Sequence, residues 1–148
     1  MQKSHPIILL GLGLLFSCHV FAHDLTGLWK AHNDEGQPTG YIHITAEQGV
    51  YKGVIEKVLQ TDQEEKFCTA CKGERKDKRL IGMTVLKEVV KKGEGSYEGA
   101  EILDPFSGNT YRVILKLKEA GQILDVRAYV GIRLLGKTQT WRRVQNGQ

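Results

Sequence analysis

The clearest pattern in the chain is an alternation of apolar and polar side chains between Thr110 and Lys118. Every second residue from Tyr111 to Leu117 is apolar, and basic residues dominate the positions between them. This period of two is typical of a β-strand with one buried face. Comparable segments recur between turn sequences at a spacing of about 8–12 residues. We predict strands at Thr26–His32, Thr39–Glu47, Val50–Leu59, Leu80–Val90, Ser96–Leu103, Thr110–Lys118, Gln122–Val130 and Lys137–Val144.

No segment has the apolar period of a long amphipathic helix. The stretch from Met83 to Lys92 fits either period, and its β-branched residues favour a strand. Consecutive strands joined by short turns pair with their neighbours, and closure of the sheet removes its exposed edges. We therefore predict an all-β fold, a single antiparallel up-and-down barrel of about eight strands. Side chains fill the interior of such a barrel, or it holds one small ligand.

The N-terminal segment does not fit the strand pattern. One lysine precedes an almost wholly apolar run from Pro6 to Phe21, which is too short to form a stable membrane anchor. The run ends in Val20-Phe21-Ala22, which suits a signal peptidase site. We predict that residues 1–22 are a secretory signal peptide and that residues 23–148 form the barrel domain. Leu15-Phe16-Ser17-Cys18 also looks like a lipoprotein processing box, so membrane anchoring through a lipidated cysteine is the alternative.

Charge and cysteine content narrow the choice of partner and compartment. The chain has 21 Lys and Arg against 17 Asp and Glu, a formal net charge of +4. This small excess is interleaved with acidic residues, so a nucleic-acid partner is not indicated. An exported protein meets an oxidising compartment, where Cys68 and Cys71 tend to form a disulfide. We expect a periplasmic or secreted protein.

The first predicted strand carries Gly27-Leu28-Trp29, which resembles the Gly-x-Trp opening of the lipocalin superfamily. The resemblance implies that an arginine of the last strand packs over the tryptophan at the closed end of the barrel. Arg142 and Arg143 both lie on the last predicted strand, and alternation allows only one of them to face inward. A guanidinium over an indole ring is worth roughly 0.5–2 kcal/mol. We expect Gly27, Trp29 and one of these arginines to close the barrel.

A second resemblance extends over most of the chain. The ordered elements are Gly-x-Trp-Lys, Cys-x-x-Cys-Lys-Gly, Ile-Leu-Asp-Pro-x-x-Gly-x-Thr-Tyr, Val-Arg-x-Tyr-Val-Gly and Leu-Gly-Lys-Thr-Gln-Thr-Trp-x-Arg. Together they are similar to a family of small secreted bacterial proteins known as domain of unknown function 2147. The resemblance implies a lipocalin-like fold and leaves the activity open. These elements occupy Gly27–Lys30, Cys68–Gly73, Ile102–Tyr111, Val126–Gly131 and Leu135–Arg143.

Cys68-Thr69-Ala70-Cys71 lies in the longest break between predicted strands, Gln60–Arg79. A structural disulfide is the first interpretation, because the protein is expected to be exported. A zinc site is the second, although two further ligands are missing from the motif. A redox couple is the third, since the basic residues of this break favour a thiolate. Two free thiols without a role are the fourth.

Polar and aromatic residues on the late strands are the candidates for a ligand site. If their faces point inward, the interior has polar groups among aromatic rings, as small-ligand pockets do. We therefore predict an exported module that binds a small, partly apolar molecule of unknown identity, with thiol-disulfide redox or zinc handling through the two cysteines as the alternative. The candidate ligand-binding residues are Glu101, Arg127, Tyr129, Gln139 and Trp141.

Catalytic patterns are missing from the sequence. It has no Gly-x-Ser-x-Gly, no phosphate-binding glycine loop and no His-Glu-x-x-His. Asp104 precedes a proline, a position at which aspartate commonly stabilises a turn. The sequence therefore indicates neither an enzyme nor a cofactor.

Overall fold

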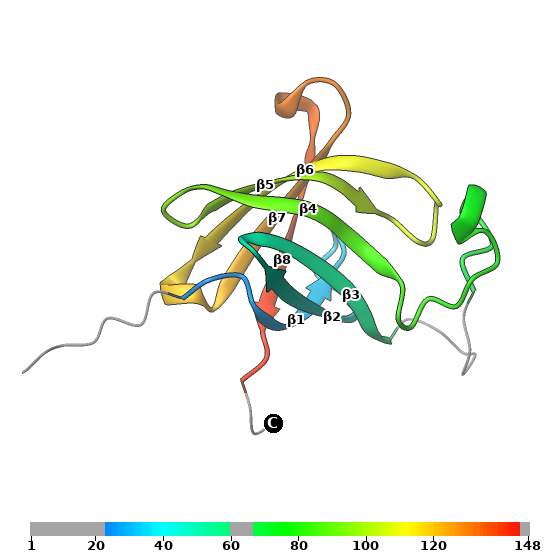
Figure 1. Ribbon diagram of the computed structural model, residues 1–148, viewed down its shortest axis with the longest axis horizontal. Helices are drawn as coiled ribbons and strands as arrows, with labels where there is room; N and C mark the ends of the chain where they lie inside the picture. The colour runs from blue at the N-terminus through cyan, green and yellow to red at the C-terminus, as the bar shows by residue number, and fades with distance from the viewer. Residues whose placement is uncertain (1–22, 60–66, 146–148) are drawn as a thin grey trace, which may run out of the picture.

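The computed structural model describes residues 23–59 and 67–145. Their strands form one closed antiparallel barrel in which each strand pairs with its neighbours along the chain and β1 also pairs with β8 (Figure 1). The predicted all-β, eight-stranded barrel is confirmed. The strands are β1 Gly27–His32, β2 Pro38–Glu47, β3 Val50–Val58, β4 Thr84–Gly93, β5 Ser96–Leu103, β6 Thr110–Lys118, β7 Ile123–Tyr129 and β8 Lys137–Arg143.

Helical structure among the described residues is limited to short 3₁₀ turns. They are η1 at Gly73–Arg75, η2 at Glu119–Gly121 and η3 at Arg133–Leu135. No helix in the described ranges has the length and apolarity needed to cross a bilayer. The predicted signal peptide, residues 1–22 with Cys18, lies outside the described residues.

The start of β4 differs from the prediction. A strand was expected from Leu80, but the chain makes a turn there, in which the Met83 N–H donates to the Leu80 carbonyl oxygen at 2.9 Å. Gly82 in this turn has a φ of +88°, a backbone conformation that glycine adopts without steric cost. The strand proper begins only at Thr84.

Irregular pairing in two adjacent strands changes which side chains face the interior. The β3–β4 register shifts between the pairs Tyr51–Val89 and Gly53–Leu86, so β4 holds one extra residue there. The β5–β6 register shifts in the same way between Gly99 and Ile102. Such a shift resets the alternation, because one added residue turns every following side chain to the opposite face.

The two ends of the barrel interior are filled differently. Large side chains pack the end formed by the β2–β3, β4–β5 and β6–β7 turns, and the rings of Tyr51 and Tyr97 meet edge to face at 5.3 Å. Within residues 23–59 and 67–145, no Asp, Glu, Lys, Arg, His, Asn, Gln, Ser or Thr side chain is buried. The largest fully buried side chains are Trp29, Tyr97, Leu25, Ile44, Leu86, Leu115, Leu124, Val89, Val113 and Val126.

Candidate functional site

The other end of the barrel encloses a cavity of about 790 Å³. It extends from the middle of the barrel to the β1–β2, β5–β6 and β7–β8 loops. Ligand pockets in proteins occupy roughly 300–1,000 Å³, so this volume suits one small molecule. The apolar wall residues are Ala31, Ile42, Ile55, Leu80, Val85, Ile102, Leu103, Val126 and Ala128.

The charged groups of the cavity carry both signs and belong to its mouth. Asp34 and Glu35 lie on the β1–β2 loop, and Asp104 lies on the β5–β6 loop. Lys57 lies near the end of β3, and Lys137 begins β8. The Lys137 Nζ lies 3.3 Å from the Asp34 Oδ2, and the Gln139 amide donates to the same carboxylate at 3.4 Å. Because the mouth carries acids and bases together, it does not select strongly for one sign of charge.

Trp141 brings a buried polar atom to the wall of the cavity. It is 3% exposed and lines the cavity, and its indole N–H has no hydrogen-bond partner among the described residues. The other tryptophan, Trp29, donates its N–H to the Leu25 carbonyl oxygen at 2.8 Å. Buried indole N–H groups usually find an acceptor, and leaving one unpaired costs about 1–3 kcal/mol. Trp141 therefore holds an unpaired donor next to the cavity, although the nitrogen itself is buried and not open to the cavity space.

Of the five residues expected to bind ligand, Gln139 and Trp141 line the cavity from the inward face of β8. Tyr129 also borders the cavity, but it lies on the Arg127 face of β7 and packs beside Gly136 of the β7–β8 loop, at the mouth.

Val126 pairs with Gln139 across β7 and β8, which places this wall residue beside the two residues of β8. Val126 was not among the predicted ligand-binding residues, although simple alternation along β7 from the buried Leu124 places it on the inward face.

Glu101 and Arg127 do not line the cavity. Regular alternation from the buried Gly99 would turn Glu101 inward, but the register shift in β5 turns Ile102 inward and Glu101 outward. Its carboxylate pairs with Arg75 and lies 3.9 Å from the Lys87 Nζ. We therefore leave it out of the proposed site.

Arg127 lies between two inward-facing residues of β7 and so points outward. Its guanidinium donates to the carbonyl oxygens of Arg133 and Leu134, both at 2.9 Å. It also donates to Thr138 Oγ1 at 2.9 Å. Arg127 thus organises the β7–β8 loop instead of the cavity.

The filled end of the barrel brings Trp29 and Arg143 together. The Arg143 Cζ lies 4.3 Å from the centroid of the Trp29 ring, a cation–π geometry. The Arg143 guanidinium also donates to the carbonyl oxygens of Asp24, Thr26 and Gly121. These contacts tie the segment before β1 to the turn after β6.

Strand alternation separates the two candidate arginines. Arg143 shares a face of β8 with the buried Trp141, whereas Arg142 is exposed on the other face. Gly27 has a φ of +122°, and a Cβ at this position would lie 3.0 Å from the Arg143 Nη1. A side chain at Gly27 would therefore strain the backbone and crowd the guanidinium.

Burial also raises the pKa values of two tyrosines near Trp29 and Arg143. Desolvation raises the pKa of Tyr97 to about 12, and the neighbouring Tyr51 and Asp24 act in the same direction. Burial likewise raises the pKa of Tyr51, whose hydroxyl donates to the Asp24 Oδ2 at 3.5 Å. Both rings therefore stay neutral well above physiological pH.

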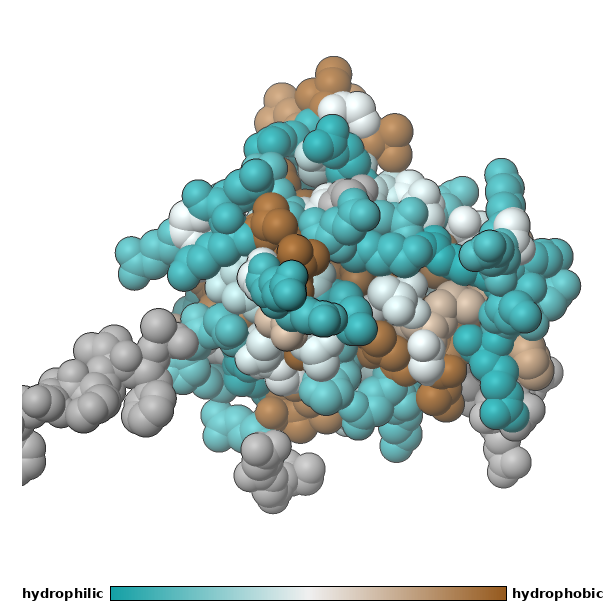
Figure 2. Space-filling view, viewed as in Figure 1, coloured by the Kyte–Doolittle hydropathy of each residue, from teal (hydrophilic) through white to brown (hydrophobic). Residues whose placement is uncertain are grey.

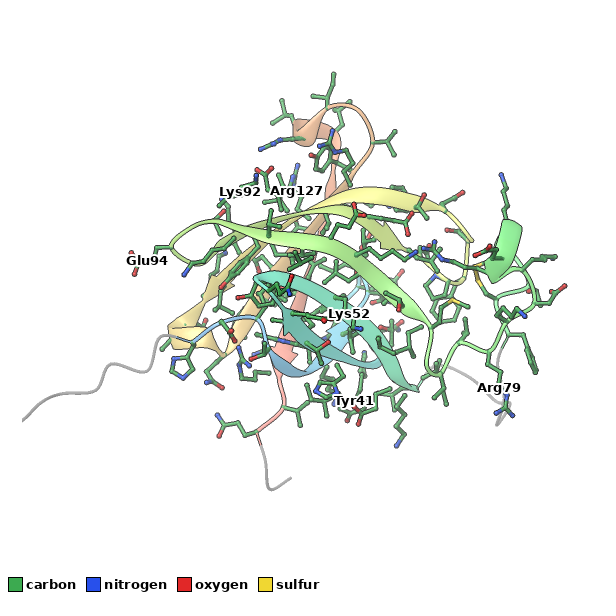
Figure 3. The ribbon with its side chains drawn as sticks, in the orientation of Figure 1. Tyr41, Lys52, Arg79, Lys92, Glu94 and Arg127 are labelled. Atoms are coloured by element: carbon green, nitrogen blue, oxygen red, sulfur yellow. A yellow bond between two sulfur atoms is a disulfide. The ribbon has the colours of Figure 1, made fainter. Side chains whose placement is uncertain are left out.

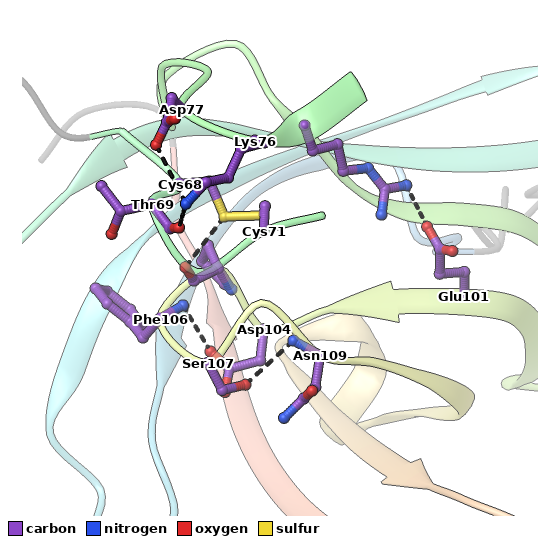
Figure 4. The surroundings of a disulfide bond; sticks show 12 residues. Cys68, Thr69, Cys71, Lys76, Asp77, Glu101, Asp104, Phe106, Ser107 and Asn109 are labelled. Carbon is purple, nitrogen blue, oxygen red and sulfur yellow. Dashed lines mark hydrogen bonds and ion pairs between the residues drawn. A yellow bond between two sulfur atoms is a disulfide. The ribbon is translucent and has the colours of Figure 1, made fainter. Parts of the chain in front are cut away.

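Cys68 and Cys71 form a disulfide (Figure 4). Their side chains are 0% and 3% exposed, so neither sulfur is open to a thiol or disulfide substrate. The Cys68 Sγ lies 3.2 Å from the Pro105 carbonyl oxygen, and a Cβ on Gly108 would lie 2.0 Å from the Ala70 carbonyl oxygen. The disulfide segment thus packs closely on the β5–β6 loop.

These observations do not favour the redox or zinc alternatives. A buried disulfide offers no thiolate for exchange or for metal ligation. The described part of the chain also contains no group of three or more His, Cys, Asp or Glu side chains placed to hold a metal ion. Asp104 accepts bonds from the Phe106 N–H at 3.0 Å and the Ser107 hydroxyl at 2.7 Å, as expected for a turn residue.

Comparison with known proteins supports the fold. The chain is similar in structure to protein HP1028 from Helicobacter pylori, which is described as belonging to the lipocalin family. The TM-score is 0.74 at 19% sequence identity, and the match covers 84% of this chain and 85% of the other. At this identity the similarity shows a shared fold. No curated protein matches the sequence significantly.

The family comparison covers the entire barrel. A family model described as "Uncharacterized protein conserved in bacteria (DUF2147)" matches residues 27–143. These limits coincide with the first residue of β1 and the last residue of β8. The chain therefore belongs to the DUF2147 family and has a lipocalin-like barrel.

Proposed function

We propose that this protein binds one small, predominantly apolar molecule that carries a hydrogen-bond acceptor, inside the open half of its barrel. The observation that carries this proposal is a cavity of about 790 Å³ with a mostly apolar wall. Trp141 belongs to this wall, and its buried indole N–H lacks an acceptor, so a small turn of the ring would bring the donor to a ligand. Apolar contact supplies most of the affinity in such pockets, and a few polar groups fix the orientation of the ligand. The lipocalin-like fold of the chain agrees with this role.

Three of the predicted residues remain in the proposed site. Trp141 donates to the ligand, while Gln139 and Tyr129 stand at the edge of the apolar region. Because the apolar wall carries no charge, we expect a neutral ligand or one whose charged group stays at the mouth.

A displacement assay tests the proposal. The fluorescent probe N-phenyl-1-naphthylamine is bound first and then displaced by a medium-chain methyl ketone or by the alkane of the same length. Trp141→Phe keeps an aromatic ring and removes the donor. It should weaken ketone binding roughly two- to tenfold, the value of one hydrogen bond, and leave alkane binding unchanged.

A second variant tests the location of the probe. Val126→Trp projects a large ring into the cavity and should abolish probe binding, whereas Thr140→Trp adds the same ring on the exposed face of β8 and should not. Equal probe affinity in both variants would contradict binding inside the barrel.

We further propose that the protein acts after export. The predicted signal peptide supports this, and disulfides such as Cys68–Cys71 persist in oxidising compartments. The mass of the exported protein tests it. A chain that begins at His23 supports cleavage after Ala22, whereas a lipid-modified chain that begins at Cys18 supports membrane anchoring.

A further inference from the structure

The loop between β7 and β8, residues 130–136, carries the most exposed large apolar side chains among the described residues. Val130, Ile132, Leu134 and Leu135 are 71%, 63%, 83% and 76% exposed, and we call these four residues the apolar tip. The loop projects from the barrel in Figure 1, and Figure 2 shows apolar residues gathered on this projection. Single exposed apolar residues need no explanation, but a contiguous group marks a contact site.

Contacts with the barrel hold the loop in this projecting shape. The Arg127 guanidinium at its base donates to the carbonyl oxygens of Arg133 and Leu134 and to the Thr138 hydroxyl (Figure 3). Gly136 packs so closely that a Cβ there would lie 2.6 Å from the Ala128 carbonyl oxygen. The fold therefore satisfies the backbone of the loop while its apolar side chains stay in water.

Basic residues accompany the apolar tip. Residues 126–145 contain no Asp or Glu, and Arg133 and Lys137 lie in or beside the loop. The carboxylates that face them come from other elements. Glu98 on β5 lies 2.9 Å from the Arg133 guanidinium, and Asp34 lies 3.3 Å from the Lys137 Nζ. Both basic side chains are more than half exposed. The single Lys137–Asp34 contact contributes little and exchanges readily for another anion, whereas the Arg133–Glu98 pair is bidentate and holds the guanidinium beside the loop.

We propose that the apolar tip inserts into the surface of a lipid bilayer, where Arg133 and Lys137 meet lipid phosphates. Apolar side chains flanked by basic ones are typical of segments that bind at the membrane interface. A stable protein interface buries about 800 Å² on each side and involves roughly 20–30 residues of each partner, many more than the four residues of the apolar tip. A bilayer needs no complementary shape and covers such a tip completely.

The apolar tip is continuous with the mouth of the cavity. Val130 and Leu135 belong to the apolar tip and also line the cavity, and Phe106 on the β5–β6 loop lines it as well and is 52% exposed. An apolar surface thus runs from the tip to the mouth. A docked barrel would take up or release an apolar ligand at the bilayer without passing it through water. This consequence rests on the proposed function, whereas binding of the tip to lipid does not.

Vesicle cosedimentation tests the proposal. The protein is the chain from His23 onward, which contains every strand of the barrel and lacks the N-terminal apolar run. The vesicles contain phosphatidylethanolamine and phosphatidylglycerol. Ile132→Ser with Leu134→Ser should weaken binding at least about tenfold, because two large apolar side chains no longer leave water. The matched control is Val50→Ser, which removes a 43% exposed apolar side chain at the opposite end of the barrel and should bind as the parent does.

A spectroscopic variant gives an independent measurement. Leu134→Trp places a reporter at the most exposed position of the tip, and its emission should shift to the blue when vesicles are added. No shift, or equal vesicle binding by the parent and the double serine variant, would overturn the proposal. A parent that forms dimers through the tip and ignores vesicles would also overturn it.

The same double variant separates this proposal from the proposed function. Ile132 and Leu134 do not line the cavity, so probe binding in solution should be unchanged in the variant that loses vesicle binding. Conversely, Val126→Trp should lose probe binding and keep vesicle binding, because it fills the cavity and leaves the apolar tip unchanged.

Discussion

Replacement of Arg143 by methionine is the most informative test of how the barrel closes. Methionine keeps much of the aliphatic stem but removes the guanidinium that lies over Trp29. The carbonyl oxygens of Asp24, Thr26 and Gly121 then lose their donor. The two strands β1 and β8 pair through only two residue pairs, Trp29–Arg143 and Lys30–Arg142. The contacts of Arg143 therefore stabilise a short junction that closes the barrel.

The expected magnitude follows from these contacts. A hydrogen bond from a charged donor is worth about 1.5–3 kcal/mol, and the cation–π contact adds about 0.5–2 kcal/mol. Burial of the guanidinium opposes these gains, and the same burial lowers the pKa of Arg143. We therefore expect a net loss of about 3 kcal/mol, less than the sum of the separate contacts.

Thermal and denaturant unfolding measure this loss. For a domain of this size the melting temperature should fall by roughly 10 °C. Arg142→Met is the matched control, since Arg142 is exposed on the opposite face of β8 and its loss should change the stability by less than about 0.5 kcal/mol. Equal melting temperatures for the two variants would refute the role assigned to Arg143.

Other predictions concern the same barrel. Trp29→Ala should cost about 3–5 kcal/mol in denaturant unfolding, and an unchanged midpoint would exclude a structural role for the buried ring. Serine at both Cys68 and Cys71 should lower the melting temperature by a few degrees, because the closed ring is shorter than the 15-residue loop for which the chain-entropy model gives about 3 kcal/mol. Amide exchange should accelerate across residues 67–79 and not in the strands; global acceleration would contradict this. Burial raises the pKa of Tyr97 to about 12, so the folded state resists its ionisation. The free energy of unfolding should keep its full value below pH 10 and decline as the pH rises towards 12. Tyr97→Phe should reduce this decline, and an identical pH profile in the variant would show that ionisation of Tyr97 is not its cause.

Much of the fold was predictable because a half-buried strand imposes a period of two on its sequence. The pattern from Thr110 to Lys118 is regular, and β6 occupies exactly that range in the structure. The start of β4 was not predictable, since the turn before Thr84 depends on hydrogen bonds to β3. Glu101 illustrates the same limit, because a register shift against β6 turns it outward without any signal in the local pattern.

The candidate site was predictable only in part. Alternation along β8 places Gln139, Trp141 and Arg143 on one face, which correctly groups two cavity residues with the arginine over Trp29. The role of Arg127 was missed, because hydrogen bonds to loop carbonyl oxygens leave no periodic trace. The unpaired indole N–H was beyond sequence reasoning, since it depends on the three-dimensional surroundings of a single atom.

Native mass spectrometry of the protein isolated from its native cell measures ligand occupancy of the barrel. We expect one bound molecule per chain, small enough for a cavity of about 790 Å³ and absent from the Val126→Trp variant prepared in the same way. The Thr140→Trp control should retain it. A parent protein that carries no ligand, or a ligand that persists when the cavity is filled, would refute binding inside the barrel.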